Sequence, residues 1–270
     1  MYFVASLHGK VKYETVKLYI SAISNFYVEH NKPLRANSML QLHRILKGIK
    51  RSSSSQQRTR RPITIHILSQ ISSLLRPTFS EELDTVMLWA AFTLAFFGFL
   101  RVSEFTYSSA KTFLAVRDVT FIPNIATPTS IQVHIKQSKT DPFRQGTTLV
   151  IAKNHSPVCA VTALREYLLQ RDPADPEEPL FMLQNKEPPT RTILNANLRE
   201  LLNILGYVET EYAPHSFRIG AATTAAAANI PPWLIKTLGR WRSDCYELYI
   251  RTPRTIIQSV PKKLAAVLNP

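Results

Sequence analysis

Three short segments in the second half of the chain carry side chains that together suit phosphate chemistry. His-Ser-Phe-Arg at positions 215–218 opens an Ala-rich stretch, Gly-Arg-Trp follows at positions 239–241, and Tyr249 lies just beyond. An arginine guanidinium is a planar fork of donors that matches phosphate oxygens. A phenol has a pKa near 10, and an imidazole with nearby cations makes it a better nucleophile. These groups in this order predict a site that holds a phosphodiester and attacks it through a tyrosine.

Each of these residues also has an ordinary structural interpretation. His215 and Arg218 are three positions apart, so at a helix start they share one face, and the helix N-terminus itself favours an anion. The alternative is a histidine at a helix start with an arginine at the edge of the core. Trp241 can be a core anchor. Tyr246 and Tyr249 also share one helix face, so either can be structural.

Two further candidates lie earlier in the chain. Arg101 follows the long apolar stretch 86–100, and a buried arginine needs a pairing partner or an anion. Glu104 is three residues away, so a local ion pair is the alternative to a phosphate. Lys139 lies in the polar connection 137–146, at or near the tip of an expected hairpin, where it can serve as a general acid. The alternative is a solvated lysine.

The patterns around these residues predict a mostly α fold with a small β-sheet (α+β). Apolar residues at helical spacing favour helices, and Ile131, Val133 and Ile135 alternate with polar residues as in a half-buried strand. The predicted strands are 113–122, 131–135 and 147–152. The predicted helices are 15–27, 38–49, 63–75, 82–97, 158–170, 191–205, 216–229, 231–238, 243–250 and 254–267.

Composition narrows the class of protein. The chain has 270 residues, of which 45% are hydrophobic, so a sizeable core can be buried. Only seven glycines are present, and neither a P-loop nor a GxGxxG segment occurs. Two distant cysteines indicate neither a disulfide framework nor a zinc site. The stretch 86–100 is shorter than the ~20 residues that span a bilayer, and the first ten residues do not resemble a signal peptide.

The charge points to a polyanionic partner. The formal net charge is +14 at pH 7, which favours nucleic acid first and an anionic membrane second. A basic but inert surface is the alternative.

Basic residues gather where the chain is expected to change domain. The predicted organisation is a helical N-terminal unit over 1–55, a basic linker over 56–61 and a catalytic domain over 62–270. A Ser/Gln-rich run cannot build a core and is typical of a linker. Cations without any acidic residue flank it, which suits a phosphate backbone; a solvated flexible linker is the alternative. The expected DNA-binding residues are Arg51, Arg58, Arg60, Arg61 and Arg240.

The ordered set of candidates resembles the tyrosine recombinase (phage-integrase-like) family. The matching segments are Gly98 to Glu104, Ser138-Lys139-Thr140, Pro214 to Asn229 and Leu238 to Arg251. Within the family, segments 138–146 and 240–244 look most like recombinases of eukaryotic mobile elements, the DIRS and Crypton types. The resemblance implies a recombinase-like catalytic domain preceded by a short helical DNA-binding unit.

The family resemblance also implies roles. Arg101 and Arg218 clamp the scissile phosphate, and Tyr249 attacks it to leave a 3′-phosphotyrosyl bond and a 5′-hydroxyl. Lys139 protonates the leaving oxygen and His215 handles the tyrosine proton. Glu104 braces the first arginine. Trp241 or Arg240 fills the position where relatives carry His or Trp, since the usual spacing back from the tyrosine reaches Arg240.

The resemblance implies double-stranded DNA as partner, a homo-tetramer on DNA, no cofactor, no metal and no membrane association. Residues 254–268 would be the C-terminal helix that copies exchange, with Val260 and Leu264 on its apolar side. The mobile-element likeness implies nuclear localisation. Two other functions stay open: a truncated or decayed element copy that binds DNA without recombining it, and a type IB topoisomerase.

Overall fold

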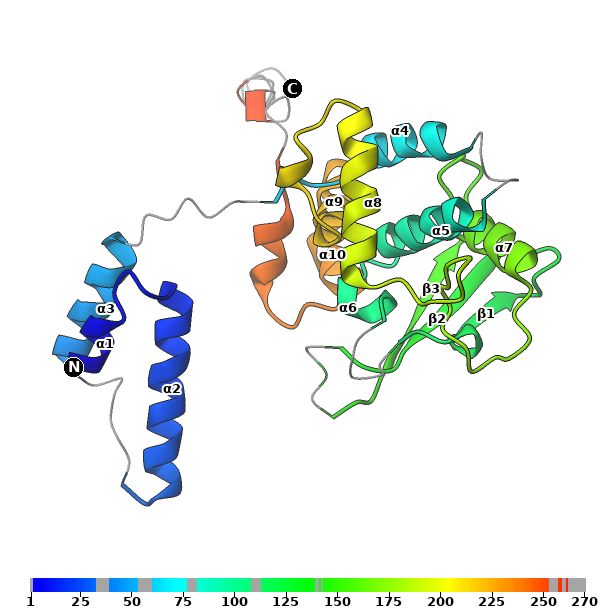
Figure 1. Ribbon diagram of the computed structural model, residues 1–270. Helices are drawn as coiled ribbons and strands as arrows, with labels where there is room; N and C mark the ends of the chain where they lie inside the picture. Colours follow the sequence, from blue (N-terminus) through cyan, green and yellow to red (C-terminus); the bar gives the residue numbers. More distant parts are fainter. Residues whose placement is uncertain are drawn as a thin grey trace. The chain divides into compact units, whose positions relative to one another are not determined.

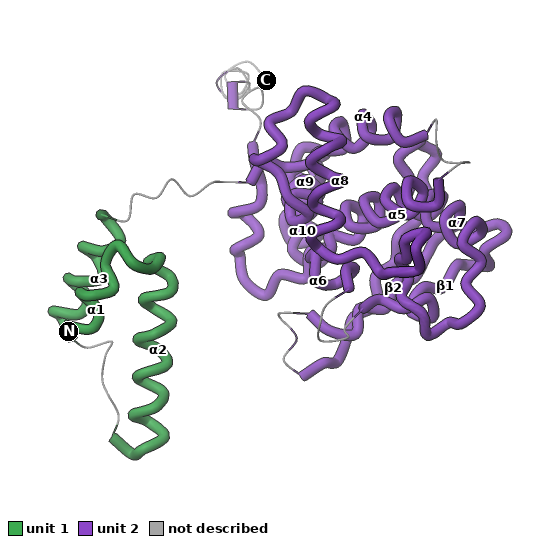
Figure 2. The backbone as a smooth tube through the Cα atoms, viewed as in Figure 1, with its two compact units in different colours: residues 1–58 green, residues 59–270 purple. Residues whose placement is uncertain are grey.

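The computed structural model describes residues 2–32, 39–52, 60–76, 82–107, 113–138, 141, 143–252, 257–258 and 261. The chain divides into two compact units, residues 1–58 and 59–270 (Figure 2). Helices dominate and three strands form one sheet (Figure 1). The predicted fold class, mostly α with a small β-sheet, is therefore confirmed. The predicted linker 56–61 falls largely on residues outside the described ones and stays a prediction.

The first unit consists of helices α1 (Tyr2–Ser6), α2 (Tyr13–Glu29) and α3 (Leu40–Ser52). Its small core is formed by Val4, Val16, Leu42 and Ile49. Since the apolar positions of α3 face this core, its charged residues face outward. The exposed residues of α3 include Arg44, Lys47, Lys50 and Arg51.

The second unit is built around α5 (Leu83–Phe97), whose residues from Thr85 to Phe96 are all buried. A helix that is apolar on every side must be surrounded by other elements. It packs against α4 (Ile65–Leu75), α7 (Ala160–Arg171) and α9 (His215–Ala227). No helix among the described residues is long and apolar enough to cross a bilayer.

The sheet is antiparallel, with strand order β1 (Val119–Ile122), β2 (Ser130–Ile135) and β3 (Thr147–Ala152). Ile131, Val133 and Ile135 face the core as their alternation predicts. The predicted strand 113–122 is wrong in its first part, since Val116–Asp118 form a 3-10 turn (η3). The Asp118 carboxylate accepts the Ala115 backbone N–H at 2.8 Å and closes that turn, so the strand begins only at Val119.

The remaining elements are α6 (Val102–Phe105), α8 (Arg191–Ile204), η4 (Glu209–Glu211), α10 (Pro232–Leu238) and η5 (Asp244–Tyr249). The predicted helix 243–250 is a 3-10 helix instead of an α-helix. Its last bond runs from the Ile250 N–H to the Glu247 carbonyl, and the Arg251 N–H turns away to the Thr223 side chain. Most of the predicted helix 254–267, including Val260 and Leu264, lies outside the described residues.

Helix α9 lies unusually close to the extended segment that precedes α4. The Ile63 N–H donates to the Ser216 carbonyl at 3.0 Å. A Cβ built on Gly220 would lie 1.7 Å from the Ile63 carbonyl oxygen. Only a glycine permits this approach, because the obstructing atoms belong to the backbone.

Gly220→Ala therefore tests the packing of α9. The added methyl should destabilise the second unit by about 3 kcal/mol, which exceeds the ~1 kcal/mol that alanine gains in a helix. Urea unfolding followed by circular dichroism measures the change. Gly48→Ala on α3 is the matched control, since a Cβ there meets no atom within 4 Å; it should leave the transition of the second unit unchanged. An equally stable Gly220→Ala variant would contradict the packing.

Candidate active site

Arg218 is the most buried charged group of the site. It lies in the first turns of α9, is 1% exposed, and donates to the backbone carbonyls of Phe99 and Gly239. Its guanidinium carbon lies 4.2 Å from the centroid of the Trp241 ring, a cation–π contact. Burial, and then the charges of Arg101 and Arg240, lower the pKa of Arg218 to about 9, so the group is still protonated at neutral pH.

Glu104 lies at the centre of the neighbouring arginines, with a side chain that is 1% exposed. Its Oε1 accepts from Arg101 Nη1 at 2.9 Å, and its Oε2 accepts from the Arg101 backbone N–H at 2.8 Å and from Arg240 Nη2 at 2.6 Å. The ion pair between Arg101 and Glu104 is thus present, and it fixes the start of α6. It does not remove Arg101 from the surface, because that side chain stays 15% exposed.

These charges leave the site electropositive. Three guanidinium groups, those of Arg101, Arg218 and Arg240, act on one another and on the single carboxylate of Glu104. Three positive charges against one negative charge leave an excess of two. Like charges that act on one another in a buried site raise the free energy of the folded state unless an anion neutralises them. The arrangement is therefore suited to a phosphate carrying non-bridging oxygens.

Arg240 and Trp241 have different surroundings, which bears on the role that the sequence left open between them. Arg240 has a side chain only 10% exposed and donates to Glu104 and to the Gly98 carbonyl, at 2.6 and 3.0 Å. The Trp241 ring lies between Arg218 and Tyr249, with 5.3 Å between the Trp241 and Tyr249 centroids. Trp241 thus lies against the candidate nucleophile, whereas Arg240 is bonded to Glu104. The DNA-binding role of Arg240 stays a prediction.

Gly239 makes room for this tryptophan. A Cβ on Gly239 would lie 1.6 Å from a Trp241 ring atom. The Gly-x-Trp pattern is therefore a packing requirement, since any side chain at Gly239 would displace the ring from the guanidinium that it covers.

The two tyrosines of η5 face different environments. Tyr246 is 7% exposed and belongs to the hydrophobic core, whereas Tyr249 is half-buried at the edge of the site. The Tyr249 ring lies 5.3 Å from the His215 ring and contributes to the electrostatic environment of Arg218. Tyr249 is thus the tyrosine that lies beside the imidazole and close enough to act on the Arg218 guanidinium.

His215 is held in its neutral form. Burial lowers its pKa to about 4, and the charges of Arg218, Arg101 and Arg191 add to that effect. A neutral imidazole beside a phenol can accept the proton of that phenol. Arg191, the exposed first residue of α8, was missed by the sequence analysis. Its only signal was a helix start after Thr190, and nothing in the sequence indicates that this start lies near His215.

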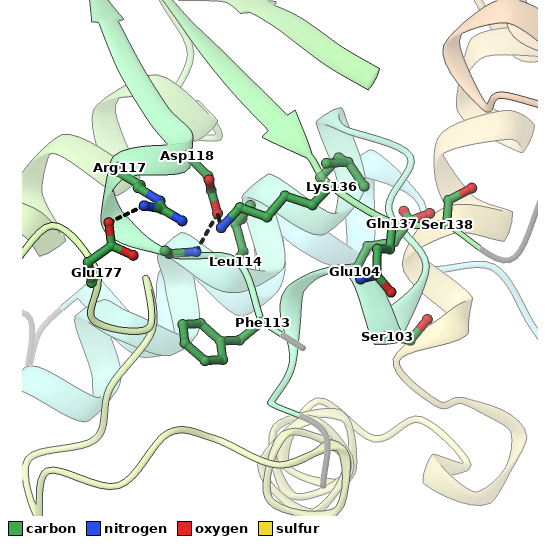
Figure 3. A pocket seen from close by; sticks show the side chains of 12 residues that line it. Ser103, Glu104, Phe113, Leu114, Arg117, Asp118, Lys136, Gln137, Ser138 and Glu177 are labelled. Carbon is green, nitrogen blue, oxygen red and sulfur yellow. Dashed lines mark hydrogen bonds and ion pairs between the residues drawn. The ribbon is translucent and has the colours of Figure 1, made fainter. Parts of the chain in front are cut away.

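Lys139 lies outside the described residues, but the base of its hairpin is described. A cavity of about 540 Å³ is lined by α6, the segment 113–118 and the end of β2 with the base of this hairpin, and Figure 3 shows Ser103 and Glu104 near Gln137 and Ser138 on one side of it. The hairpin thus leaves the sheet next to the carboxylate that holds Arg101. Lys136, which also lines this cavity, is paired with Asp118 at 2.8 Å.

The arginines expected to bind DNA differ in their surroundings. Arg51 is exposed at the end of α3, and Arg58 lies outside the described residues. Arg60 donates to the carbonyls of Thr210 and Tyr212, at 2.6 and 3.1 Å, and Arg61 pairs with Glu211 at 2.7 Å. These two cations hold the start of the second unit against η4.

The described residues include no group of three or more His, Cys, Asp or Glu side chains placed to hold a metal ion.

The fold is that of tyrosine recombinases and integrases. The structure of the Tn1549 transposon integrase in complex with transposon right end DNA matches with a TM-score of 0.61 at 17% identity, over 97% of this chain and 83% of that chain. A XerH site-specific recombinase bound to a palindromic difH substrate matches with a TM-score of 0.57 at 14% identity, over 74% of this chain. The matched part spans 51% of the XerH chain, about half its length.

The sequence is similar to a member of the same family. The chain is 25% identical over 250 residues to an integrase/recombinase xerD homolog of Selenomonas ruminantium, covering 90% of this chain and 69% of that protein. No protein-family model matches the chain. Sequence and fold thus both support the tyrosine recombinase and integrase family.

Glu104→Gln tests the charge arrangement. Removal of the carboxylate charge leaves Arg101 and Arg240 close together without their shared counter-ion, so the second unit should lose about 3–5 kcal/mol of stability. Chemical unfolding measures this loss. The control is Glu177→Gln, which breaks an exposed pair with Arg117 and should cost well under ~1 kcal/mol. Equal stability of the two variants would contradict the bracing role of Glu104.

The low pKa of His215 gives a pH dependence. The unfolded imidazole binds its proton near pH 6.5 and the folded one only near pH 4, so the unfolded state binds more protons between these values. Stability should therefore fall as the pH drops from 6.5 to 4, by up to about 3 kcal/mol from this group. The free energy of unfolding, measured at several pH values across this range, should change less with pH for His215→Asn than for the wild type. The variant His155→Asn, at an exposed site, should show the wild-type change with pH. An unchanged slope in His215→Asn would refute the assignment.

Proposed function

We propose that the chain is a site-specific DNA recombinase or integrase that cleaves and rejoins a DNA strand through a phosphotyrosyl intermediate on Tyr249. The observation that carries this proposal is the clustering of Tyr249, His215 and Trp241 beside a group of three arginines and one glutamate, whose charges leave an excess of two positive charges. The net charge of +14 also favours a nucleic-acid partner.

The proposed reaction gives each group one role, and the role of Lys139 comes from the sequence resemblance. Arg101 and Arg218 bind the non-bridging oxygens of the phosphate, where fixed positive charge stabilises the transition state. Neutral His215 accepts the phenol proton as the Tyr249 oxygen attacks phosphorus. The bond from phosphorus to the 5′-oxygen breaks, and Lys139 donates a proton to that oxygen. A 3′-phosphotyrosyl bond and a free 5′-hydroxyl remain.

Rejoining reverses these steps with a 5′-hydroxyl as the nucleophile. One phosphoester is exchanged for another, so the strand is resealed without a nucleotide cofactor. Attack by the original 5′-end restores the duplex, and attack by the end of a second duplex recombines the two. The Trp241 ring lies against the Arg218 guanidinium, and a guanidinium that is shielded from water interacts more strongly with a phosphate.

Double-stranded DNA is the proposed substrate. The solved relatives were obtained with DNA, a difH substrate for XerH and a transposon end for the Tn1549 integrase. The transposon integrase supports a role in mobile-element movement. The eukaryotic DIRS or Crypton subtype, the homo-tetramer and nuclear localisation remain proposals from the sequence resemblance.

A covalent trap tests the proposal. The full chain is incubated with a pool of nicked duplexes of randomised sequence, in which cleavage beside the nick releases a short fragment and prevents rejoining. The intact protein should enrich a subset of duplexes as covalent adducts that survive denaturation. Tyr249→Phe should abolish the adduct, and Tyr246→Phe should retain it. If Tyr249→Phe still forms the adduct, or if only Tyr246→Phe loses it, the assignment of Tyr249 as the nucleophile is wrong.

The same pool then distinguishes the alternative activities. With a captured duplex, strand transfer between two differently labelled copies indicates a recombinase, and relaxation of supercoils without such transfer indicates a type IB topoisomerase. If duplexes of the pool are bound but none is captured covalently, the chain is a non-catalytic DNA-binding protein.

A further inference from the structure

Thr223 joins helix α9 to the segment that carries the candidate nucleophile. Thr223 is buried, with 5% of the residue exposed. The hydroxyl donates to the Tyr249 backbone carbonyl at 3.1 Å and accepts from the Arg251 backbone N–H at 3.1 Å. One hydroxyl thus holds the chain on both sides of Ile250. We propose that Thr223 is a positioning residue that fixes the Tyr249 phenol beside His215 and Arg218 of its own chain; this inference rests on the proposed function.

The segment η5 needs such an attachment because it has little internal rigidity. It is a six-residue 3-10 helix, a conformation with weaker hydrogen-bond geometry than an α-helix. At its start, Asp244 pairs with Lys236 at 2.8 Å, but the Asp244 side chain is 75% exposed, and such pairs contribute little. In its middle, Tyr246 packs into the core. At its end, the buried Thr223 hydroxyl holds the backbone of the nucleophile itself.

Helix α9 is a suitable rigid support. It carries His215, Arg218 and Thr223, and its residues from Ser216 to Thr223 are all buried. Thr223 follows Arg218 by little more than one turn, so the two lie about 7–8 Å apart along the axis. The helix is also fixed by its close approach to Ile63 at Gly220. The Thr223 hydroxyl therefore sets the position of Tyr249 in the same frame as the guanidinium and the imidazole.

The chemistry explains why this position matters. Attack on phosphorus requires the phenol oxygen close to the phosphate and aligned with the leaving oxygen, and a displacement of 1 Å can cost ~100-fold in rate. Loss of the Thr223 hydroxyl would free the backbone at Tyr249 without removing any group that contacts the phosphate. The expected defect is slow adduct formation with normal DNA affinity.

The test compares variants on the duplex captured by the intact protein. Thr223→Val keeps the branched shape and removes the hydroxyl, so single-turnover adduct formation should slow by roughly 10- to 100-fold, with the DNA dissociation constant within about twofold of wild type. Thr223→Ser keeps the hydroxyl and should restore the rate to within about threefold. Thr223→Ala, which only removes atoms, provides the same comparison if the valine variant does not fold.

Thr93→Val is the matched control. The Thr93 hydroxyl is fully buried on α5 and donates to the carbonyls of Trp89 and Ala90 in its own helix, so its loss should leave the rate of adduct formation unchanged. The proposal is overturned if Thr223→Val forms the adduct at the wild-type rate, if Thr223→Ser is as slow as Thr223→Val, or if Thr93→Val is equally slow. If the intact protein forms no adduct at all, the proposed function itself fails, which distinguishes the two results.

Discussion

The shared carboxylate of Glu104 is the interaction on which the site depends. It accepts hydrogen bonds from Arg101 and Arg240 together, while Arg218 lies close enough for their charges to lower its pKa. One buried acid among three guanidinium groups holds the loop at Gly98–Arg101 and the turn at Gly239–Trp241 in one place. It leaves a positive excess that a phosphate can neutralise. The stability of the site and its affinity for an anion are therefore two consequences of the same charge arrangement.

The groups proposed for chemistry differ in how rigidly they are held. His215 and Arg218 belong to a buried α-helix that packs against α5, and Arg101 begins a short helix whose third residue is Glu104. Tyr249, in contrast, ends a 3-10 segment whose backbone is attached to α9 through Thr223. The groups proposed to bind phosphate thus come from fixed elements, whereas the proposed nucleophile comes from a short 3-10 segment. The position of the phenol is therefore set by a different element from those that carry the guanidinium groups.

Several residues could be assigned from sequence because local rules determine them. The pairing of Arg101 with Glu104 follows from their three-residue spacing at a helix start, and the half-buried strand from Ile131 to Ile135 follows from its alternation. One prediction failed where a side chain redirected the backbone: the Asp118 carboxylate closes a turn inside the predicted strand 113–122. The predicted helix 243–250 forms as the 3-10 segment Asp244–Tyr249, and the Thr223 hydroxyl draws the chain away at its end. Both effects depend on specific hydrogen bonds, which periodicity does not contain.

The sequence by itself determined the kinds of chemical group, their order and the helical framework, because residue type and apolar spacing are local properties. It did not decide which of Arg240 and Trp241 faces the tyrosine, since the residues are adjacent and only the packing of the turn at Gly239 separates them. Nor did it indicate that Arg191 lies near His215, or that Arg60 and Arg61 bind the backbone and acid of η4. These facts depend on contacts between residues far apart in the chain. Such contacts are fixed only when the helices pack and bring distant charges into one low-dielectric environment, where their mutual energies become large.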